Sequence, residues 1–487
     1  MARSTRPPSR PRARLRIGGE LCEGVGVEGI TDPFDGSTVG EASVGGPAEI
    51  DAAIAAAENA FLVTRRMPTH ERAAILERAA SSIRARGEEL AELMARESGK
   101  PVRFGRAEVS RAVLTFTLAA AECRTQRGEL LPIDLEARPD RGTEGRMALV
   151  TRVPRGPVAA ISPFNFPLNL IAHKLAPAIA VGASVVLKPP PQCPLTGLEL
   201  AAILDDAGLP PGALNVVHCP PEVAQRMVED ERIKVLSFTG SDAVGWKLKA
   251  LAGKKQVLLE LGGNAPCVVD EGVDLARVLE PILLGAWAHA GQVCIKVQRI
   301  FVHASLHDRF LEAFVERTRR LSVGDPLDPE TVVGPLIEER HAVRVLAWIR
   351  EAVEGGARLH CGGERSGRGV TPAVLTGTSP GMKVCREEVF GPVTVVEPFA
   401  DFDRAIEACN ATRFGLQAGV FTRDLGRAMA ACRDLEYGGV MINDVPTFRV
   451  DNFPYGGSKD SGFGREGVRS AMEELSEPKV LVLRSFA

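Results

Sequence analysis

Residues 235–264 have the sequence VLSFTGSDAVGWKLKALAGKKQVLLELGGN, and this stretch decides the fold that we predict. Two short apolar runs, 235–238 and 257–259, lie on either side of a helical segment. Similar runs, each separated from the next by a helical stretch, occur upstream at residues 158–161, 184–187 and 214–217. Strands that alternate with helices of this length form βαβ units, so the sequence predicts an α/β protein with a parallel sheet.

The rest of the chain adds a second α/β region and a small β extension. Gly262 and Gly263 mark a break, after which strands and helices alternate again from residue 267 to about 443. Apolar spacings of three and four predict amphipathic helices over residues 48–61, 69–97 and 107–123. Residues 129–154 alternate around a polar turn at 138–144, which predicts a long hairpin, and residues 479–484 predict a last strand that pairs with it.

The composition excludes several classes of protein. The chain has 487 residues, of which 45% are hydrophobic and 25% charged, as in an ordinary globular protein. The net charge of −3 gives no overall field that would attract nucleic acid or an anionic membrane. No apolar run is long enough to span a membrane. The basic residues 1–16 lack the apolar core of a secretory signal, so we predict a disordered tail and a cytoplasmic protein.

The cysteines indicate that any functional cysteine acts alone. None of the 10 cysteines forms a CxxC pair, which disfavours a disulfide scaffold and a structural zinc site, and we predict no metal. His303 and His307 are four residues apart, but the HExxH pattern is absent, which favours a surface pair. Cys294 is the candidate, because Gly291 lets the backbone approach a ligand there. The alternative is a small buried hydrophobic side chain.

Three further segments at strand ends carry candidate polar groups. Glu260 ends an apolar strand beside flexible glycines, a position in which it can act as a general base. A surface carboxylate and a helix cap are the alternatives. Asn165 follows the strand at 158–161 and has an amide that can donate to an oxyanion, although a turn asparagine is the alternative. Gly240 and Ser241 follow another strand and open a helix, where backbone N–H groups favour a phosphate. An ordinary strand-to-helix turn fits these two residues equally well.

Taken together, seven segments in order resemble the motif series of the aldehyde dehydrogenase superfamily. They are PFNFP at 163–167, LKP at 187–189, FTGS at 238–241, LELGGN at 259–264, GQVC at 291–294, EEVFGP at 387–392 and GFGRE at 462–466. Residues 443–462 are similar to bacterial relatives that act on lactaldehyde, semialdehydes and phosphonoacetaldehyde. The resemblance covers the chain from about residue 17 to its C-terminus.

The resemblance implies a Rossmann-like cofactor-binding domain, a second α/β catalytic domain and a small β oligomerisation extension. It assigns residues 17–128 and 155–262 to the first, 263–452 to the second, and 129–154 with 475–487 to the extension. Such segments build homodimers or homotetramers in the family. Because a monomer would leave the edges of the extension unpaired, we expect a homo-oligomer.

The resemblance also implies a role for each motif residue. Cys294 would attack the aldehyde, the Asn165 amide and the Cys294 backbone N–H would hold the oxyanion, and Glu260 would activate the water that hydrolyses the thioester. Seven residues would line the cofactor site, with Lys188 on the adenosine ribose, Ser241 on the pyrophosphate and Glu388 on the nicotinamide ribose, and Phe164, Gly240, Gly262 and Phe390 beside them. Lys174 and Glu466 match positions associated with proton relay or with structural support.

Two departures from the family pattern bear on the cofactor and the substrate. Many members that prefer NAD carry a glutamate three residues after the motif lysine, where this chain has Pro191. Since no carboxylate there would repel a 2′-phosphate, we favour NADP over NAD. Arg449 can hold an anionic tail, with Phe166 and Val293 as further contacts to the aldehyde; a structural ion pair is the alternative. Relatives that bind phosphorylated substrates tend to carry arginine at the position of Val293.

Two other functions stay open at this point. One is a catalytically silent protein of this fold, which the joint presence of Cys294, Glu260 and Asn165 argues against. The other is a dehydrogenase that transfers the acyl group to coenzyme A. Relatives of that kind usually lack the motif glutamate, so Glu260 favours hydrolysis.

Overall fold

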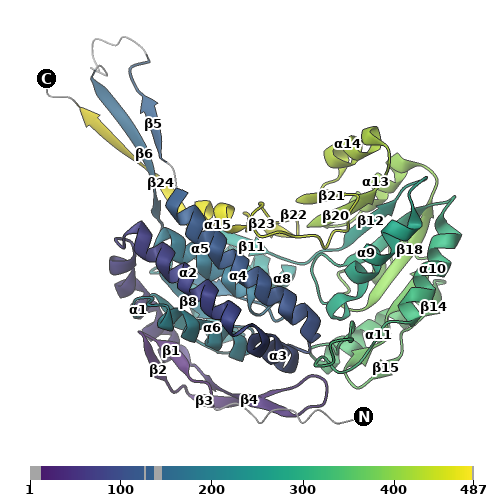
Figure 1. The fold of residues 1–487 in the computed structure, drawn as a ribbon, viewed down its shortest axis with the longest axis horizontal. Coiled ribbons are helices and arrows are strands. Elements are labelled where there is room, and N and C mark those ends of the chain that lie inside the picture. Colours follow the sequence, from purple (N-terminus) through teal and green to yellow (C-terminus); the bar gives the residue numbers. More distant parts are fainter. Residues whose placement is uncertain (1–11, 126–127, 136–144, 485–487) are drawn as a thin grey trace.

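The computed structural model describes residues 12–125, 128–135 and 145–484, and its core contains two sheets (Figure 1). The first sheet has eight strands in the order β2-β1-β9-β8-β7-β10-β11-β23. The strands are β1 (Leu15–Ile17), β2 (Glu20–Cys22), β7 (Val158–Ile161), β8 (Val185–Lys188), β9 (Leu214–Val216), β10 (Val235–Thr239), β11 (Gln256–Glu260) and β23 (Gly462–Phe463). The five strands from β9 to β11 are parallel, as predicted.

Helices cover both faces of the first sheet. The side chains of each central strand alternate between two cores, so that Val235 packs on one face while Leu236 packs on the other. The first face carries α2 (Thr69–Ala85), α3 (Gly87–Ser98), α4 (Val102–Thr125), α5 (Asn169–Val181), α6 (Pro194–Asp206) and α15 (Val468–Glu474). The second face carries α1 (Pro47–Thr64), α7 (Pro221–Glu229) and α8 (Asp242–Leu251). Burial on both faces explains why these strands are continuous apolar runs.

The second sheet has seven strands in the order β14-β17-β18-β13-β12-β20-β21, and only β14 at its edge is antiparallel. They are β12 (Ala265–Val269), β13 (Val297–His303), β14 (Arg358–Cys361), β17 (Ala373–Thr376), β18 (Val393–Phe399), β20 (Gln417–Phe421) and β21 (Gly439–Ile442). One face packs on α9 (Leu275–Trp287), α10 (His307–Arg319), α11 (Glu339–Glu354) and α12 (Lys383–Arg386). The other packs on α13 (Phe402–Asn410) and α14 (Leu425–Asp434). This confirms the predicted second α/β region.

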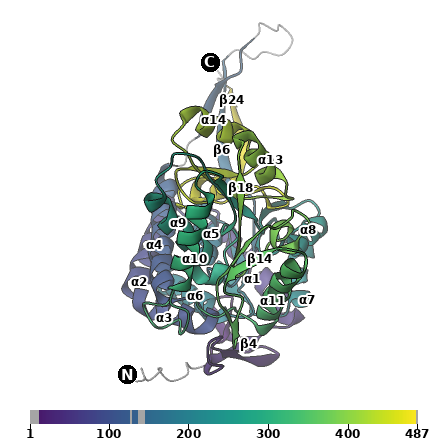
Figure 2. The same ribbon diagram turned by 90° about the vertical axis from the view of Figure 1, so that its right-hand side faces the viewer.

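A three-stranded sheet projects from the first sheet at one end of the molecule (Figures 1 and 2). Its order is β24-β6-β5, with β5 (Glu129–Pro132), β6 (Arg146–Pro154) and β24 (Ser476–Arg484) all antiparallel. The predicted pairing of the last strand with the hairpin is therefore confirmed. The predicted turn at 138–144 lies outside the described residues, and so do residues 1–11 of the predicted tail. The tail prediction is wrong at its other end, because Leu15 and Arg16 belong to β1 and Ala13 N donates a hydrogen bond to Glu41 O.

Several details differ from the predicted elements. The helix expected over residues 69–97 is two helices, because the backbone leaves the helical path at Arg86 between α2 and α3. His303 ends β13 and His307 begins α10, so the two imidazoles do not share a helix face. The remaining strands form small two-stranded pairs: β3 (Gly26–Thr31) with β4 (Thr38–Val44), β15 (Arg365–Ser366) with β16 (Gly369–Val370), and β19 (Phe414–Gly415) with β22 (Ser458–Lys459). Among the described residues, no helix is both long and apolar enough to cross a membrane.

Candidate active site

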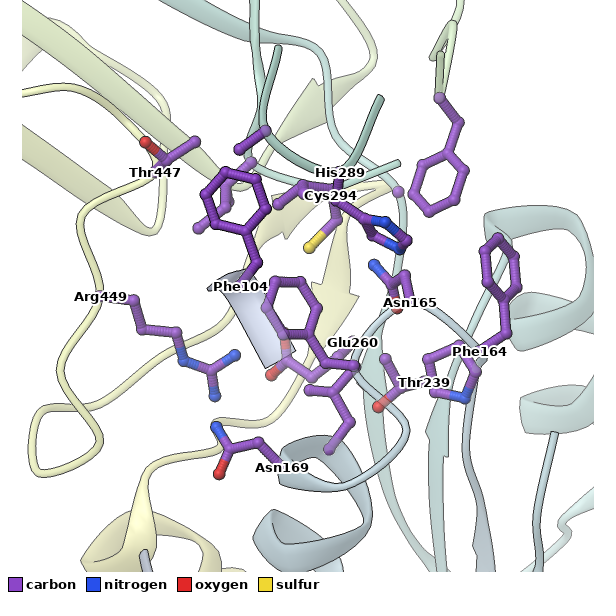
Figure 3. Close-up of a pocket in the computed structure, with 18 of the residues that line it drawn as sticks. Phe104, Phe164, Asn165, Asn169, Thr239, Glu260, His289, Cys294, Thr447 and Arg449 are labelled. Atoms are coloured by element: carbon purple, nitrogen blue, oxygen red, sulfur yellow. The ribbon is translucent and has the colours of Figure 1, made fainter. Parts of the chain in front are cut away.

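A cavity of about 710 Å³ lies at the carboxyl ends of the strands of the first sheet, and the second sheet supplies its other walls. Ligands of open α/β sheets bind at this edge. The cavity brings together twelve of the residues singled out in the sequence: Phe164, Asn165, Phe166, Gly240, Ser241, Glu260, Gly262, Val293, Cys294, Glu388, Phe390 and Arg449. Figure 3 shows Cys294, Asn165 and Glu260 between Phe164 and Thr239 on one side and Arg449, Asn169 and Thr447 on the other.

The loop that carries Cys294 is held in a strained conformation. It follows η1 (Ala288–Gly291), in which His289 and Ala290 have φ angles of 53° and 54°, a region that side chains other than glycine rarely adopt. The Gln292 side chain accepts a 3.0 Å hydrogen bond from Ile337 N and donates one to Pro335 O. A Cβ on Gly263 would lie 2.2 Å from the Cys294 carbonyl oxygen, so only glycine fits there. These contacts place Cys294 in the cavity in a defined position.

The Cys294 sulfur lies 3.4 Å from the hydroxyl oxygen of Tyr455. Burial raises the pKa of the Cys294 thiol to about 11, while the hydrogen bond with Tyr455 acts in the opposite direction. The Asn165 amide Nδ2 donates a 3.0 Å hydrogen bond to the carbonyl of Gln292, two residues before the sulfur. An amide nitrogen has two N–H groups, so the second N–H can still donate to a ligand in the cavity.

A buried carboxylate positions the segment that contains Asn165. Glu108 Oε1 accepts hydrogen bonds of 2.8 and 2.9 Å from the backbone N–H groups of Leu168 and Asn169, where α5 begins. Its other oxygen is paired with the fully buried Lys100. The Lys100 ammonium also lies 3.6 Å from the centre of the Phe166 ring. Phe166 therefore forms part of the support of this wall as well as part of the cavity lining.

Glu260 is a buried carboxyl group at the end of β11. It is 4% exposed, and among the described residues its Oε2 has no hydrogen-bond partner. Burial and the nearby charge of Glu466 raise the pKa of Glu260 well above its usual range, although Arg449 and Lys174 partly counteract this. This environment favours the protonated form of the carboxyl group and makes the ionised form a stronger base.

Lys174 and Glu466 lie behind Glu260 and outside the cavity lining. Lys174 Nζ donates to Glu466 Oε1 at 3.1 Å, to Thr239 Oγ1 at 2.7 Å and to Ser237 Oγ at 3.1 Å. Burial opposes ionisation of Glu466, but the charges of Lys174, His173 and Arg449 together outweigh it and lower the pKa of Glu466 to about 2. The geometry thus puts a buried ion pair next to the candidate base, which is compatible with either role considered from the sequence.

One side of the cavity, which we call the charged side, consists of Arg111, Asn169, Thr447, Arg449 and Tyr455. The Arg449 guanidinium lies 3.6 Å from the centre of the Tyr455 ring, and its Nη2 is 3.5 Å from Glu466 Oε2. Its buried Nε has no partner among the described residues. Arg111 is paired with the buried Asp451 at 2.6 Å and adds a second cation to this wall.

The opposite side, which we call the glycine-rich side, consists of Gly240, Ser241, Gly262, Glu388 and Phe390. A Cβ on Gly262 would lie 2.6 Å from Glu388 Oε2, so the carboxylate packs directly against the glycine backbone. Glu388 Oε1 accepts a 3.0 Å hydrogen bond from Gly263 N, and burial raises its pKa to about 7. Ser241 precedes the first turn of α8 and makes no side-chain cap, which leaves the N–H groups of that turn for a ligand.

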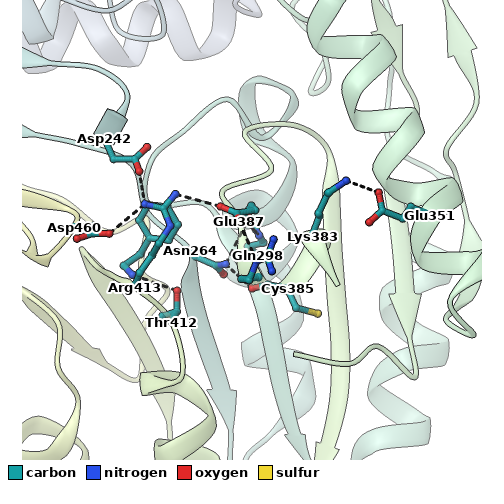
Figure 4. Close-up of polar contacts among 12 residues, drawn as sticks. Asp242, Asn264, Gln298, Glu351, Lys383, Cys385, Glu387, Thr412, Arg413 and Asp460 are labelled. Atoms are coloured by element: carbon teal, nitrogen blue, oxygen red, sulfur yellow. Dashed lines mark hydrogen bonds and ion pairs between the residues drawn. The ribbon is translucent and has the colours of Figure 1, made fainter. Parts of the chain in front are cut away.

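Amide side chains hold the loop that presents Glu388 (Figure 4). Asn264 Nδ2 donates to Cys385 O at 2.6 Å, and Gln298 Nε2 donates to Glu387 O at 2.7 Å. Arg413 pairs with Glu387 and also with Asp242 at the start of α8, which ties this loop to the first sheet. Phe390 follows with a φ angle of 43°, and its ring meets that of Phe164 edge-on at 5.9 Å.

Lys188 lies at the end of β8 and outside the lining of the main cavity. Burial lowers the pKa of its ammonium group, and within the described part of the chain its Nζ donates only a long 3.3 Å hydrogen bond, to Pro189 O. His218 and Glu28, which share a 2.8 Å hydrogen bond, lie close enough to interact with the Lys188 charge. A buried ammonium group, free helix N–H groups and a glycine cradle fit the ribose and phosphate groups of a nicotinamide cofactor.

The sequence reasoning missed several residues of the cavity, including Asn169 and Thr447 on the charged side. Tyr455 and Arg111 were not singled out, and neither was His289, which is 2% exposed and has no hydrogen-bond partner for either ring nitrogen among the described residues. No spacing in the sequence indicates them, because each reaches the cavity from a separate segment. All 10 cysteines are free, and no cluster of three or more His, Cys, Asp or Glu side chains suited to a metal occurs in the described part of the chain.

Several known proteins are similar to this chain over nearly its whole length. The profile of the aldehyde dehydrogenase family matches residues 27–481. The 3-sulfolactaldehyde dehydrogenase of Priestia aryabhattai is 42% identical over 455 residues, which are 93% of this chain and 94% of the relative. Aldehyde dehydrogenase 21 from Physcomitrella patens, solved with the reaction product succinate, has 41% identity and a TM-score of 0.95, covering 98% of this chain and 99% of that one.

A third similar protein was solved with a cofactor. Glyceraldehyde-3-phosphate dehydrogenase GapN from Methanocaldococcus jannaschii, complexed with NADP, has 38% identity and a TM-score of 0.90, covering 94% of this chain and 99% of that one. These likenesses extend over nearly the whole chain and are far above the level at which only a fold is shared. The chain therefore belongs to the aldehyde dehydrogenase family and is an NAD(P)-dependent aldehyde oxidoreductase.

Proposed function

We propose that this enzyme oxidises a short aldehyde with an anionic tail to the carboxylic acid, using Cys294 as nucleophile, Asn165 as oxyanion donor and Glu260 as general base. The observation that carries this proposal is the position of Arg449. Its guanidinium group lines the cavity that contains Cys294, and its buried Nε has no partner among the described residues. The names of two relatives support an anionic product or substrate, since one acts on 3-sulfolactaldehyde and the other was solved with succinate.

The first half of the reaction is the attack of the Cys294 thiolate on the carbonyl carbon. The C–S bond forms and the carbonyl π electrons move to oxygen, which gives a thiohemiacetal oxyanion. The free N–H of the Asn165 amide and the Cys294 backbone N–H donate to this oxygen; donors of this kind are each worth about 3 kcal/mol. The hydrogen bond from Asn165 to Gln292 O keeps the amide oriented before the substrate arrives.

The second half converts the thiohemiacetal into the acid. When bound, the nicotinamide cofactor supplies the acceptor for the hydride that leaves the carbon. Glu260 then removes a proton from water, the resulting hydroxide attacks the thioester, and the C–S bond breaks with its electron pair returning to sulfur. Burial, which raises the pKa of Glu260, makes it a stronger base once it is ionised. Glu260 also favours water over coenzyme A as the acceptor of the acyl group.

The charged side suits a carboxylate or sulfonate tail. Arg449 and Arg111 are two cations on one wall. Each uses only part of its hydrogen-bonding capacity in its contact with an acidic neighbour. The contact of Arg449 with Glu466 is long, at 3.5 Å, so a structural ion pair uses little of the guanidinium group. Phe166 and Val293 provide the apolar contacts next to the reacting carbon.

We infer that NADP is the preferred cofactor. The residue three positions after Lys188 is Pro191, so no carboxylate from this turn opposes a 2′-phosphate. The NADP bound to the similar GapN structure supports this choice, and Lys188, Ser241 and Glu388 are the residues that would hold the cofactor.

We also infer that the three-stranded sheet mediates homodimer or homotetramer formation. β24 is at the edge of this sheet, and Val480, Leu481, Val482 and Leu483 are each between 51% and 58% exposed. Apolar side chains exposed on both faces of an edge strand favour pairing with another chain. Light scattering of a Val480→Glu, Val482→Glu double variant tests this, because smaller particles are expected while an unchanged mass would contradict it.

The decisive test of the substrate is Arg449→Ala, assayed with succinic semialdehyde and with uncharged butanal by absorbance at 340 nm. Loss of a charge-assisted contact raises KM for the anionic aldehyde by about 10- to 100-fold and leaves KM for butanal nearly unchanged. Arg423→Ala, a change at an exposed arginine far from the cavity, is the matched control. An equal change for both aldehydes would refute the role of Arg449 in binding the tail.

A further inference from the structure

Tyr455 is the residue that contacts the sulfur of Cys294, and its position is fixed by the backbone. It lies between β21 and β22 and is 3% exposed. Its backbone exchanges two hydrogen bonds with Glu466: Tyr455 N donates to Glu466 O at 2.9 Å, and Glu466 N donates to Tyr455 O at 2.7 Å. The phenol ring therefore projects from a rigid bridge, and its hydroxyl oxygen stands 3.4 Å from Cys294 Sγ.

Arg449 packs over the same ring. Its guanidinium carbon lies 3.6 Å from the ring centre, so the cation covers one face of the phenol. A positive charge close to the ring draws electron density away from the hydroxyl group and makes its hydrogen a better donor. Arg449, Tyr455 and Cys294 thus form a chain from the cation through the phenol to the sulfur.

The sulfur needs such a donor. Burial raises the pKa of the Cys294 thiol, and the charges of Glu388 and Glu260 raise it further, whereas Tyr455 and Arg449 lower it. Burial also raises the pKa of the Tyr455 phenol well above its usual range, so the hydroxyl keeps its proton. A phenol is a stronger hydrogen-bond donor than a thiol, and a thiolate is an acceptor. The direction O–H to S⁻ is therefore favoured once the sulfur is ionised.

We propose that the Tyr455 hydroxyl donates a hydrogen bond to the Cys294 thiolate and stabilises it, which makes Tyr455 a further catalytic residue. This rests on the proposed role of Cys294 as the nucleophile. When the sulfur attacks the aldehyde, its charge passes to the carbonyl oxygen and the bond from Tyr455 weakens. When the thioester is hydrolysed, the C–S bond breaks, the electron pair returns to sulfur, and the same hydroxyl stabilises the leaving thiolate. Tyr455 keeps its proton throughout.

The test is the pH dependence of alkylation of Cys294 by iodoacetamide in Tyr455→Phe, followed by mass spectrometry of the peptide that contains Cys294. We expect the apparent pKa to rise by about one unit and the rate at neutral pH to fall about tenfold, because a hydrogen bond to a charged group is lost. Alkylation of the exposed Cys432 in the same sample serves as internal control and stays unchanged. Equal alkylation of Cys294 would overturn the proposal, because the phenol would then not stabilise the thiolate. Faster alkylation would also overturn it, because it would mean that the thiol donates to the phenol.

Tyr437 provides the matched control variant. It is the other of the two tyrosines of the chain, is also buried, and its hydroxyl donates to Cys409 O at 2.6 Å, away from the cavity. Tyr437→Phe loses a comparable hydrogen bond, and we expect it to leave Cys294 alkylation as in the wild type. Tyr455→Phe should also lower kcat more than it raises the aldehyde KM. If Tyr455 had only a structural role, the substitution would leave the apparent pKa of Cys294 alkylation unchanged.

A second measurement keeps the proposal testable if Tyr455→Phe does not fold. With 2 tyrosines, 3-fluorotyrosine labelling yields two ¹⁹F resonances, and Tyr437→Phe assigns them. The Tyr455 resonance should shift as the thiol titrates, and this shift should vanish in Cys294→Ser. A resonance that ignores the thiol titration would overturn the hydrogen bond. Full activity of Cys294→Ala would instead refute the proposed function, so the two failures are distinguishable.

Discussion

The two sides of the active-site cavity are built in different ways. The glycine-rich side uses backbone: Gly262 lies against Glu388, and Ser241 presents the first turn of α8. The charged side uses long side chains from separate segments, such as Arg111 from α4 and Arg449 from the loop after β21. Backbone recognition depends on short local motifs and suits a ligand with a constant shape. Side-chain recognition depends on pairs of charges and changes with each substitution, which suits the part of the substrate that varies between relatives.

The largest expected effect comes from removing the proposed nucleophile, the Cys294 sulfur, which lies between the two sides. Cys294→Ala should lower the rate of aldehyde oxidation at 340 nm by at least about 10³-fold, because no other group in the cavity can form the thioester. Binding of NADP, measured by fluorescence titration, should stay within about twofold of the wild type, since the glycine-rich side is intact. Cys432→Ala on α14 is the control and should be fully active. Substantial turnover by the Cys294 variant would show that the nucleophile has been assigned wrongly.

The next effect separates the two halves of the reaction. Glu260→Gln should still release one equivalent of reduced cofactor in a burst, while steady turnover falls by about 10²-fold or more, because the thioester forms and is no longer hydrolysed with the help of a base. Glu354→Gln, at an exposed position that ends α11, is the control.

The same variant tests the sign of the pH dependence. Burial and Glu466 raise the pKa of Glu260 well above its usual range, so its base form accumulates only as the pH rises through that raised value. Hydrolysis by the wild type should therefore increase as the pH rises through the raised pKa of Glu260, and Glu260→Gln should lose this increase. A wild-type rate that falls over the same range would contradict the assignment.

A smaller effect tests whether the glycine-rich side acts on the cofactor alone. In Gly262→Ala the added Cβ would lie 2.6 Å from Glu388 Oε2 and displace that carboxylate. We expect KM for the cofactor to rise about tenfold, equivalent to about 1.4 kcal/mol, with KM for the aldehyde unchanged. Gly381→Ala is the control, because a Cβ there meets nothing within 4 Å. A selective loss of aldehyde affinity would contradict the assignment of cofactor binding to the glycine-rich side and aldehyde binding to the charged side.

The smallest effect sharpens the choice of cofactor. Pro191→Glu places a carboxylate near the position proposed for the 2′-phosphate, and like charges a few ångströms apart in water cost about 1 kcal/mol. We expect kcat/KM with NADP to fall about fivefold while that with NAD is unchanged or higher. Pro191→Gln has the same length without the charge and serves as control. A wild type that uses NAD at least tenfold better than NADP would remove the premise of this experiment and the inference with it.

The predictable part of the molecule consists of contiguous segments. The runs at 158–161 and 235–238 proved to be β7 and part of β10. They could be predicted because a parallel strand that is buried on both faces has a continuous apolar sequence. Cys294, Glu260 and Asn165 were found through motifs whose residues are neighbours in the chain. The break between α2 and α3 was missed, because the apolar spacing continues across Arg86 while the backbone does not.

The unpredicted part consists of contacts between distant segments. Tyr455 lies 161 positions from Cys294, and Arg111 lies 340 positions from its partner Asp451. His289 enters the cavity because the backbone of η1 takes left-handed angles, which no residue pattern indicates.

The sequence by itself predicted the α/β class, the alternation of helices with parallel strands, and the candidates proposed as nucleophile, oxyanion donor and base, since periodicity and local motifs are properties of neighbouring residues. Only the tertiary structure decided that Glu260 is buried beside Glu466, that Arg449 covers Tyr455, and that Tyr455 reaches the sulfur. The physical reason is that pKa shifts and hydrogen bonds depend on distance and burial, and the folded chain sets both by joining segments that are remote in sequence.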